Sequence, residues 1–171
     1  MKVYVGKIKN NRTDTAYELL RSALRNEYGS DMPNIVKDGY GKPYFSEEIG
    51  IYFSISHSGS FVMCAVDTSP VGADIQIIKD VSEHMKNRLC SKTELECVDF
   101  ISLWCMKESF IKFKGYLDRP YKDIVFTPDE KVFHGPENTF AKLLTAPEGY
   151  RAAVCGPVEN EHSAIMCVNC Y

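Results

Sequence analysis

The stretch Trp104-Cys105-Met106-Lys107-Glu108-Ser109-Phe110-Ile111-Lys112 sets one acidic residue between two lysines at helical spacing. Residues four apart are neighbours on a helix, so Trp104, Glu108 and Lys112 are expected to share one face. Lys107 lies about 100° round the helix from Glu108, where it can flank a group that Glu108 contacts through a metal. A carboxylate and amines on one rigid element indicate phosphate chemistry.

The sequence around this stretch predicts a mixture of helices and short strands. A helix is expected from about Asp99 to Lys114, ending before Gly115, and Ser91-Lys92-Thr93-Glu94 has the form of a capping box that begins an earlier helix. Hydrophobic periodicity predicts another helix over about residues 13–28. Strands are predicted over residues 3–8, 51–56, 61–66, 71–77, 124–126, 140–144, 152–155 and 164–168. A strand–helix–strands block followed by helices and strands predicts an α+β fold with two lobes.

Composition limits the functional classes. The 171 residues, 44% of them hydrophobic, can bury one sizeable core and favour one compact unit. A net charge of −3 and a pI of about 5.8 argue against a nucleic-acid-binding protein, which would normally carry a dominant basic face. An anionic ligand must therefore be bound by local positive charge.

The N-terminus and the cysteines indicate a cytoplasmic protein. The first residues lack the apolar run of a signal peptide, and no stretch is long enough to span a bilayer, so we expect no membrane association. Seven scattered cysteines suit reduced thiols better than a disulfide framework. The Cys167-Val168-Asn169-Cys170 spacing has no matching second pair, which favours two ordinary thiols over a zinc site.

An acidic residue lies in the apolar stretch Val71-Gly72-Ala73-Asp74-Ile75-Gln76. In a mostly buried strand, Asp74 is either a paired buried acid or a cation ligand. Gln76 points to the same face by the two-residue period, and both side chains offer oxygen to a hard cation. With Glu108 they could form a sparse magnesium site that a diphosphate substrate would complete.

Other polar residues suit an anionic phosphate. His57 lies among hydroxyls in Ser54-Ile55-Ser56-His57-Ser58-Gly59, where serine hydroxyls and a protonated imidazole can bind phosphate. Lys42 lies on the turn Gly41-Lys42-Pro43, and Lys9 and Arg12 precede the first helix. Each of these residues, taken alone, also fits an ordinary surface or turn position.

Taken in order, Gly41-Lys42-Pro43, Ser56-His57-Ser58, Gly72-Ala73-Asp74 and Trp104 to Ser109 with Lys112 resemble the 4′-phosphopantetheinyl transferase superfamily. The resemblance is to the two-lobed class that activates surfactin-type peptide synthetases, and it is good from about Lys2 to Gly115 and weak beyond. It implies two similar α+β lobes related by pseudo-twofold symmetry. The lobes would span residues 1–70 and 71–171 of a monomer, with the active site in the cleft between them.

Such enzymes transfer the 4′-phosphopantetheine arm of coenzyme A to a serine of a carrier-protein domain and release adenosine 3′,5′-bisphosphate, with Mg²⁺. The resemblance therefore implies coenzyme A as co-substrate, magnesium as metal and a carrier-protein partner. An alternative from another class is a degenerate transferase, a non-catalytic module that binds coenzyme A or a carrier protein. The presence of Lys107, Glu108 and Lys112 argues against that alternative.

The resemblance also implies roles for individual residues. The metal ligands would be Asp74, Gln76 and Glu108. The catalytic residues would be Glu108 and Lys112, and Trp104 would orient Glu108. Coenzyme A would be bound by Arg12, Lys42, Ser56, His57 and Lys107. The serine proton would pass either to Glu108 or to a magnesium-bound water, and the sequence leaves both open.

Two departures from the family pattern bear on affinity. Gln76 stands where many relatives have glutamate, which removes one charge from the expected metal site. The region before the first helix is shorter than is typical of the two-lobed class, which removes basic residues that would help to hold the 3′-phosphate.

Overall fold

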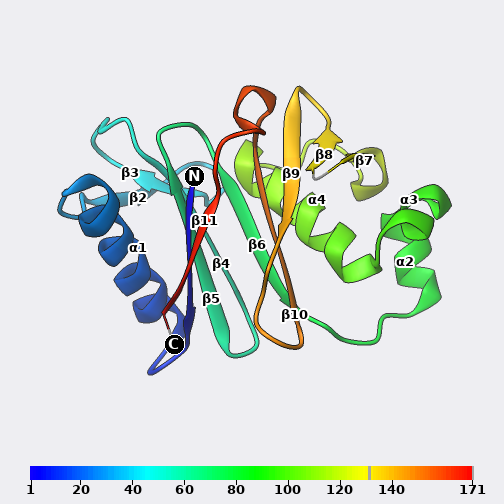
Figure 1. Ribbon diagram of the computed structural model, residues 1–171, viewed down its shortest axis with the longest axis horizontal. Coiled ribbons are helices and arrows are strands. Elements are labelled where there is room, and N and C mark those ends of the chain that lie inside the picture. The colour runs from blue at the N-terminus through cyan, green and yellow to red at the C-terminus, as the bar shows by residue number, and fades with distance from the viewer. Residues whose placement is uncertain (131, 171) are drawn as a thin grey trace.

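The computed structural model describes residues 1–130 and 132–170 and has a mixed α+β architecture, as predicted. A four-stranded sheet has the order β11-β1-β5-β4 and a five-stranded sheet the order β6-β10-β9-β8-β7. A small two-stranded sheet pairs β2 with β3. The two large sheets lie side by side in Figure 1, with β4 next to β6.

The first sheet carries one long helix. Its strands are β1 (Lys2–Lys7), β4 (Tyr52–Ser58), β5 (Phe61–Asp67) and β11 (Met166–Cys170), while β2 (Ile35–Lys37) and β3 (Pro43–Phe45) lie at its margin. Helix α1 (Arg12–Tyr28) packs on β5 and β1 (Figure 1). The apolar residues that recur along α1 are buried there, and Gly29 ends the helix in the left-handed conformation, with φ 62°.

The second sheet carries helix α4 (Phe100–Lys114), which packs on β6 and β10. Its strands are β6 (Gly72–Ile77), β7 (Thr127–Asp129), β8 (Val132–Gly135), β9 (Thr139–Leu144) and β10 (Tyr150–Pro157). Two short helices, α2 (Glu83–Leu89) and α3 (Lys92–Cys97), precede α4, and the 3-10 turns η1 (Tyr121–Asp123) and η2 (Val158–Asn160) lie in the connections. The capping box predicted at Ser91 and Glu94 is present at the start of α3.

Serine side chains join the two sheets. The hydroxyls of Ser54, Ser56 and Ser58 on β4 accept hydrogen bonds from backbone N–H groups on β6, at 3.0, 3.3 and 3.0 Å respectively. The three serines are two residues apart, so they point to the same side of β4. The hydroxyls therefore align β6 along β4.

A glycine lets helix α4 approach the junction between the sheets. A Cβ atom at Gly72 would lie 1.8 Å from the backbone oxygen of Ser109, which no larger residue could occupy without displacing the helix. Gly72 opens β6, two residues before Asp74. This close contact places the polar face of α4 above the middle of β6.

The sequence did not predict α2, β2, β3 or β8, and three further details differ from its prediction. The predicted strand over residues 124–126 is wrong, because that segment is irregular and the strand begins at Thr127. His57 and Ser58 belong to β4 and do not form the turn expected after it. The last strand, β11, pairs in parallel with β1, so it lies in the first sheet although the chain division at residue 70 assigned it to the second lobe.

The cysteines carry free thiols, and the helices are short for a membrane span. All seven cysteines are free, and three of them are exposed. In the part of the chain that the structure describes, no helix is long and apolar enough to cross a membrane.

Candidate active site

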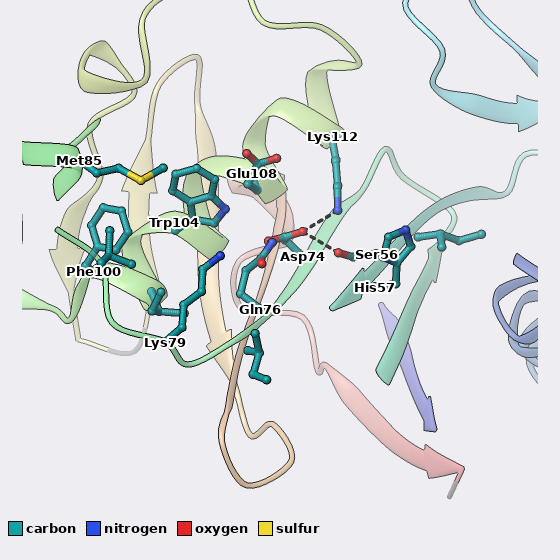
Figure 2. Close-up of a pocket in the computed structure, with 14 residues that line it drawn as sticks. Ser56, His57, Asp74, Gln76, Lys79, Met85, Phe100, Trp104, Glu108 and Lys112 are labelled. Atoms are coloured by element: carbon teal, nitrogen blue, oxygen red, sulfur yellow. Dashed lines mark hydrogen bonds and ion pairs between the residues drawn. The ribbon is translucent and has the colours of Figure 1, made fainter. Parts of the chain in front are cut away.

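A cavity of about 420 Å³ lies where β4, β6 and α4 meet. One side of the cavity wall is polar and charged. The other side is largely apolar and contains Met85, Phe100 and Trp104, at the left of Figure 2. The polar wall contains six of the nine site residues expected from the sequence: Ser56, His57, Asp74, Gln76, Glu108 and Lys112. Strands from both sheets and the long helix thus contribute to one cavity.

Asp74 lies at the centre of the polar wall (Figure 2) and is only 1% exposed. Its Oδ1 accepts hydrogen bonds from the Ser56 hydroxyl and the Lys112 ammonium, each at 2.6 Å. Its Oδ2 accepts one from the Gln76 amide at 2.9 Å. A buried carboxylate needs such partners, and these fix Asp74 at the floor of the cavity.

Lys112 joins the helix to the strand. Its side chain is 30% exposed, so the ammonium that pairs with Asp74 also reaches the open cavity. An ammonium has three donor hydrogens, and Asp74 uses one. The other donors are available to an anion in the cavity.

Glu108 lies one helical turn before Lys112, and its Oε1 accepts a hydrogen bond from the Tyr121 phenol at 2.5 Å. Burial raises the pKa of the Glu108 carboxyl, and the nearby charge of Asp74 raises it further. The Tyr121 hydrogen bond and the Lys112 charge act in the opposite direction. A carboxyl with a raised pKa is better suited to accept a proton near neutral pH.

His57 lies on the other side of Asp74 from the apolar wall (Figure 2). Burial lowers the pKa of its imidazole, and the positive charges of Arg12 and Lys112 lower it further. Arg12 begins helix α1 and is close enough to act on His57 electrostatically, although it does not line the cavity itself. His57 and Lys112 therefore line this end of the cavity, and Arg12 acts on it from outside.

Sequence comparison gives the family. The chain is 35% identical over 165 residues to a 4′-phosphopantetheinyl transferase of Bacillus subtilis, covering 85% of this chain and 73% of the relative. It is 34% identical over 166 residues, with the same coverage, to 4′-phosphopantetheinyl transferase Sfp of Bacillus subtilis strain 168. The chain belongs to the 4′-phosphopantetheinyl transferase family. It is thus an enzyme of the surfactin-type class that its motifs resembled.

More distant relatives carry the same description. The chain is 33% identical over 120 residues to 4′-phosphopantetheinyl transferase psf-1 of Bacillus pumilus, covering 63% of this chain and 52% of the relative. It is 28% identical over 108 residues to 4′-phosphopantetheinyl transferase AcpT of Escherichia coli K12, covering 54% of each. No protein-family model matches the chain.

The oxygen donors of the cavity could supply only part of the ligand shell of a magnesium ion. In the residues that the structure describes, no group of three or more His, Cys, Asp or Glu side chains is arranged to hold a metal ion. The cavity instead offers the carboxylates of Asp74 and Glu108. Magnesium usually takes one or two protein carboxylates and completes its shell with substrate phosphates and water. This donor set therefore fits magnesium bound together with a phosphate-bearing substrate.

The amide nitrogen of Gln76, and not its oxygen, faces Asp74, whereas a metal ligand would have to offer the oxygen. Its amide nitrogen donates to Asp74, while its oxygen accepts a 3.4 Å hydrogen bond from the Ser58 hydroxyl. The ligand role requires the amide to turn about its last bond, which exchanges oxygen and nitrogen with little change in shape. The Ser58 hydroxyl can donate or accept, so it can bond either end of the amide.

Lys107 does not fit the expected contact with coenzyme A. Its side chain is 1% exposed, and its ammonium pairs with Glu94 at 2.9 Å. It also donates to the backbone oxygens of Leu89 and Tyr121, at 3.1 and 3.0 Å. The helical offset from Glu108 points Lys107 into the protein, where it binds α2, α3 and η1 to α4.

Lys42 lies apart from the cavity floor. Its ammonium donates to the backbone oxygen of Phe113 at 2.8 Å, near the end of α4, and burial lowers its pKa. It lines a second, smaller hollow of about 260 Å³ that Lys112 also borders. Lys42 therefore contacts the end of α4, the helix whose residues Glu108 and Lys112 line the larger cavity.

Several residues at the site were not predicted, and four of them have side chains that bear on its chemistry or shape. Lys79, Met85 and Phe100 line the cavity of the transferase, and Tyr121 binds Glu108 from behind. These residues follow no common sequence pattern, because each comes from a different element: a loop, α2, the start of α4 and η1. Only the tertiary fold brings them together.

Proposed function

We propose that this transferase moves the 4′-phosphopantetheine arm of coenzyme A to a serine of a carrier-protein domain, with magnesium, and releases adenosine 3′,5′-bisphosphate. The observation that carries the proposal is the joint position of Asp74, Glu108 and Lys112 around one cavity. Two carboxylates and an ammonium suit the binding of a diphosphate with a hard cation.

The bonds in this reaction balance without a covalent enzyme intermediate. The serine oxygen forms a bond to the phosphorus that carries pantetheine, and the bond from that phosphorus to the bridging diphosphate oxygen breaks. The electron pair of the broken bond leaves with the 5′-phosphate of adenosine 3′,5′-bisphosphate. The serine proton would pass to a base, either Glu108 in the cavity wall or a water bound to the metal.

The other residues of the cavity would position and neutralise the substrate. Asp74 and Glu108, with Gln76 after its amide turns, would hold magnesium, which would supply charge stabilisation to the diphosphate. Lys112, held by Asp74, would place an ammonium beside the transferred phosphoryl group. The hydrogen bonds that Asp74 accepts from Lys112 and Ser56 hold its carboxylate and the Lys112 ammonium in place without substrate, which reduces the cost of reorganisation.

His57 and Arg12 would bind the 3′-phosphate end of coenzyme A. The positive charges of Arg12 and Lys112 both act on His57 and favour an anionic group at this end of the cavity. Ser56 would contribute indirectly, because its hydroxyl is used by Asp74 and by the backbone of β6. Lys42 would bind the nucleotide half from the neighbouring hollow that Lys112 also borders.

The two-lobed arrangement would place this cavity between similar halves. Each large sheet carries one long helix, α1 or α4, and β4 and β6 meet between them. We assign residues 1–70 with the strand Met166–Cys170 to the first lobe and residues 71–165 to the second. We further propose a monomer, and exposed free cysteines support a reducing, cytoplasmic setting.

The reaction is tested by its small product. The protein is incubated with coenzyme A, Mg²⁺ and an apo carrier domain, and adenosine 3′,5′-bisphosphate is measured by chromatography. Product formed in a one-to-one ratio with carrier, and absent with a carrier whose acceptor serine is replaced by alanine, supports the proposal. Coenzyme A binding without product on several unrelated carriers would contradict it and favour a binding module.

A further inference from the structure

A tyrosine outside the cavity contacts the carboxylate that the proposed reaction depends on. Tyr121 opens the η1 turn, and its phenol donates to Oε1 of Glu108 at 2.5 Å. Within the described residues, the cavity wall includes Glu108 but not Tyr121. Tyr121 therefore contacts the site from outside the cavity, through the carboxylate of Glu108 and the ring of Trp104.

Tyr121 is itself held in place from two directions. Its ring stacks on Trp104, with centroids 5.6 Å apart and planes 23° apart. Its backbone oxygen accepts the hydrogen bond from Lys107 at 3.0 Å, and Lys107 is in turn paired with buried Glu94. The phenol is thus fixed by packing and by a buried ion pair before any ligand binds.

The hydrogen bond has a geometric consequence for Glu108. A carboxylate on a helix has several staggered side-chain conformations, and a bond to one oxygen selects among them. With Oε1 used by the phenol, the carboxylate orientation is set, and Oε2 is the oxygen that remains for a ligand in the cavity. A hydrogen bond to a charged group is strong enough to enforce this choice.

We propose that Tyr121 is a positioning residue that aims Glu108 into the cavity, with Trp104 and Lys107 as its supports. This inference rests on the proposed function, because it concerns the same carboxylate. It also changes the role given to Trp104, which orients Glu108 through the ring of Tyr121. Lys107, expected to bind coenzyme A, acts on the site through the backbone of the same tyrosine.

The test removes the phenolic oxygen and keeps the ring. Tyr121→Phe preserves the stack on Trp104 and the backbone oxygen that Lys107 binds. Tyr52→Phe makes the same chemical change on an exposed tyrosine of β4 that does not line the cavity, and serves as the matched control. Trp104 is the single tryptophan, so an unchanged emission spectrum verifies that the ring of residue 121 still stacks on it.

Two measurements report on Glu108 itself. Mn²⁺ binding in the presence of coenzyme A is followed by electron paramagnetic resonance of the free ion, and kcat and KM for coenzyme A are measured with Mg²⁺. Tyr121→Phe is expected to weaken Mn²⁺ binding and lower kcat by about tenfold each, the size expected for one hydrogen bond to a charged group. The KM for coenzyme A should change by less than about twofold.

A double-mutant cycle separates positioning from a purely structural role. In a Glu108→Gln background, Tyr121→Phe should cause no further loss of Mn²⁺ affinity, because the effect passes through the carboxylate. Wild-type Mn²⁺ affinity and kcat in Tyr121→Phe, or equal losses with and without Glu108, would overturn the inference while leaving the transfer reaction standing. Absence of transfer in the wild-type protein would instead refute the proposed function, and the Mn²⁺ cycle would still decide the role of Tyr121.

Discussion

Replacing Lys107 by methionine tests whether this lysine is structural or binds the substrate. The ammonium and the Glu94 carboxylate are 2.9 Å apart and only 1% and 3% exposed. Methionine matches much of the lysine volume but leaves the Glu94 charge buried without its partner, and it removes the bonds to two backbone oxygens. Breaking a buried pair on one side costs about 3–5 kcal/mol, which is a large part of the stability of a domain of this size.

The loss is measured by urea unfolding and by thermal unfolding. A cost of about 3–5 kcal/mol corresponds to a fall in Tm of about 10 °C or more. The double variant Lys107→Met with Glu94→Gln removes the stranded charge and should recover part of the loss. A free-energy change below about 1 kcal/mol, together with a large rise in KM for coenzyme A, would refute the structural assignment and restore the contact with coenzyme A.

Three further changes probe the cavity. Glu108→Gln should lower the rate of transfer about a hundredfold or more. The Tm should not change, because the amide oxygen can still accept the hydrogen bond from Tyr121. Near-wild-type turnover at limiting Mg²⁺ would contradict the proposed role of the Glu108 carboxylate. Lys112→Ala should lower kcat more than coenzyme A affinity measured by calorimetry, and equal losses would indicate ground-state binding only. Burial and the positive charges of Arg12 and Lys112 lower the pKa of His57, so the folded protein favours the neutral imidazole. The resulting contribution to the free energy of unfolding is present above the unfolded pKa of about 6.5, and it is lost as the pH falls through the folded pKa. His57→Asn should therefore unfold with a weaker pH dependence between pH 7.5 and 5.5, and an unchanged dependence in urea titrations would contradict the shift.

The sequence predicted α1, α3 and α4 because their signals are local, and it missed the short α2. The apolar stripe and glycine stop of α1, and the Asp99 cap and Gly115 end of α4, all lie within the element that they define. The spacing of Trp104, Glu108 and Lys112 likewise needs only helical geometry, and all three line the cavity. Local periodicity thus located the face of α4 that lines the cavity.

Partners contributed by other elements could not be predicted. The alternating serines of β4 were interpreted as phosphate-binding hydroxyls, whereas they bond to the backbone of β6 and one of them to Asp74. The direction of Lys107 follows from Glu94 on another helix, and the bond from Tyr121 to Glu108 joins residues of two elements. The parallel pairing of β11 with β1 connects the two ends of the described chain, and the sequence carries no sign of that pairing.

Magnesium-dependent transfer is tested most directly by the intact mass of an apo carrier domain after incubation with the protein, coenzyme A and Mg²⁺. We expect a mass gain equal to one phosphopantetheine on the carrier serine, lost when a chelator is added and strongly reduced in Asp74→Asn. An unchanged carrier mass in the presence of bound coenzyme A, or a full gain that survives the chelator, would contradict a magnesium-dependent transfer at Asp74, Glu108 and Lys112.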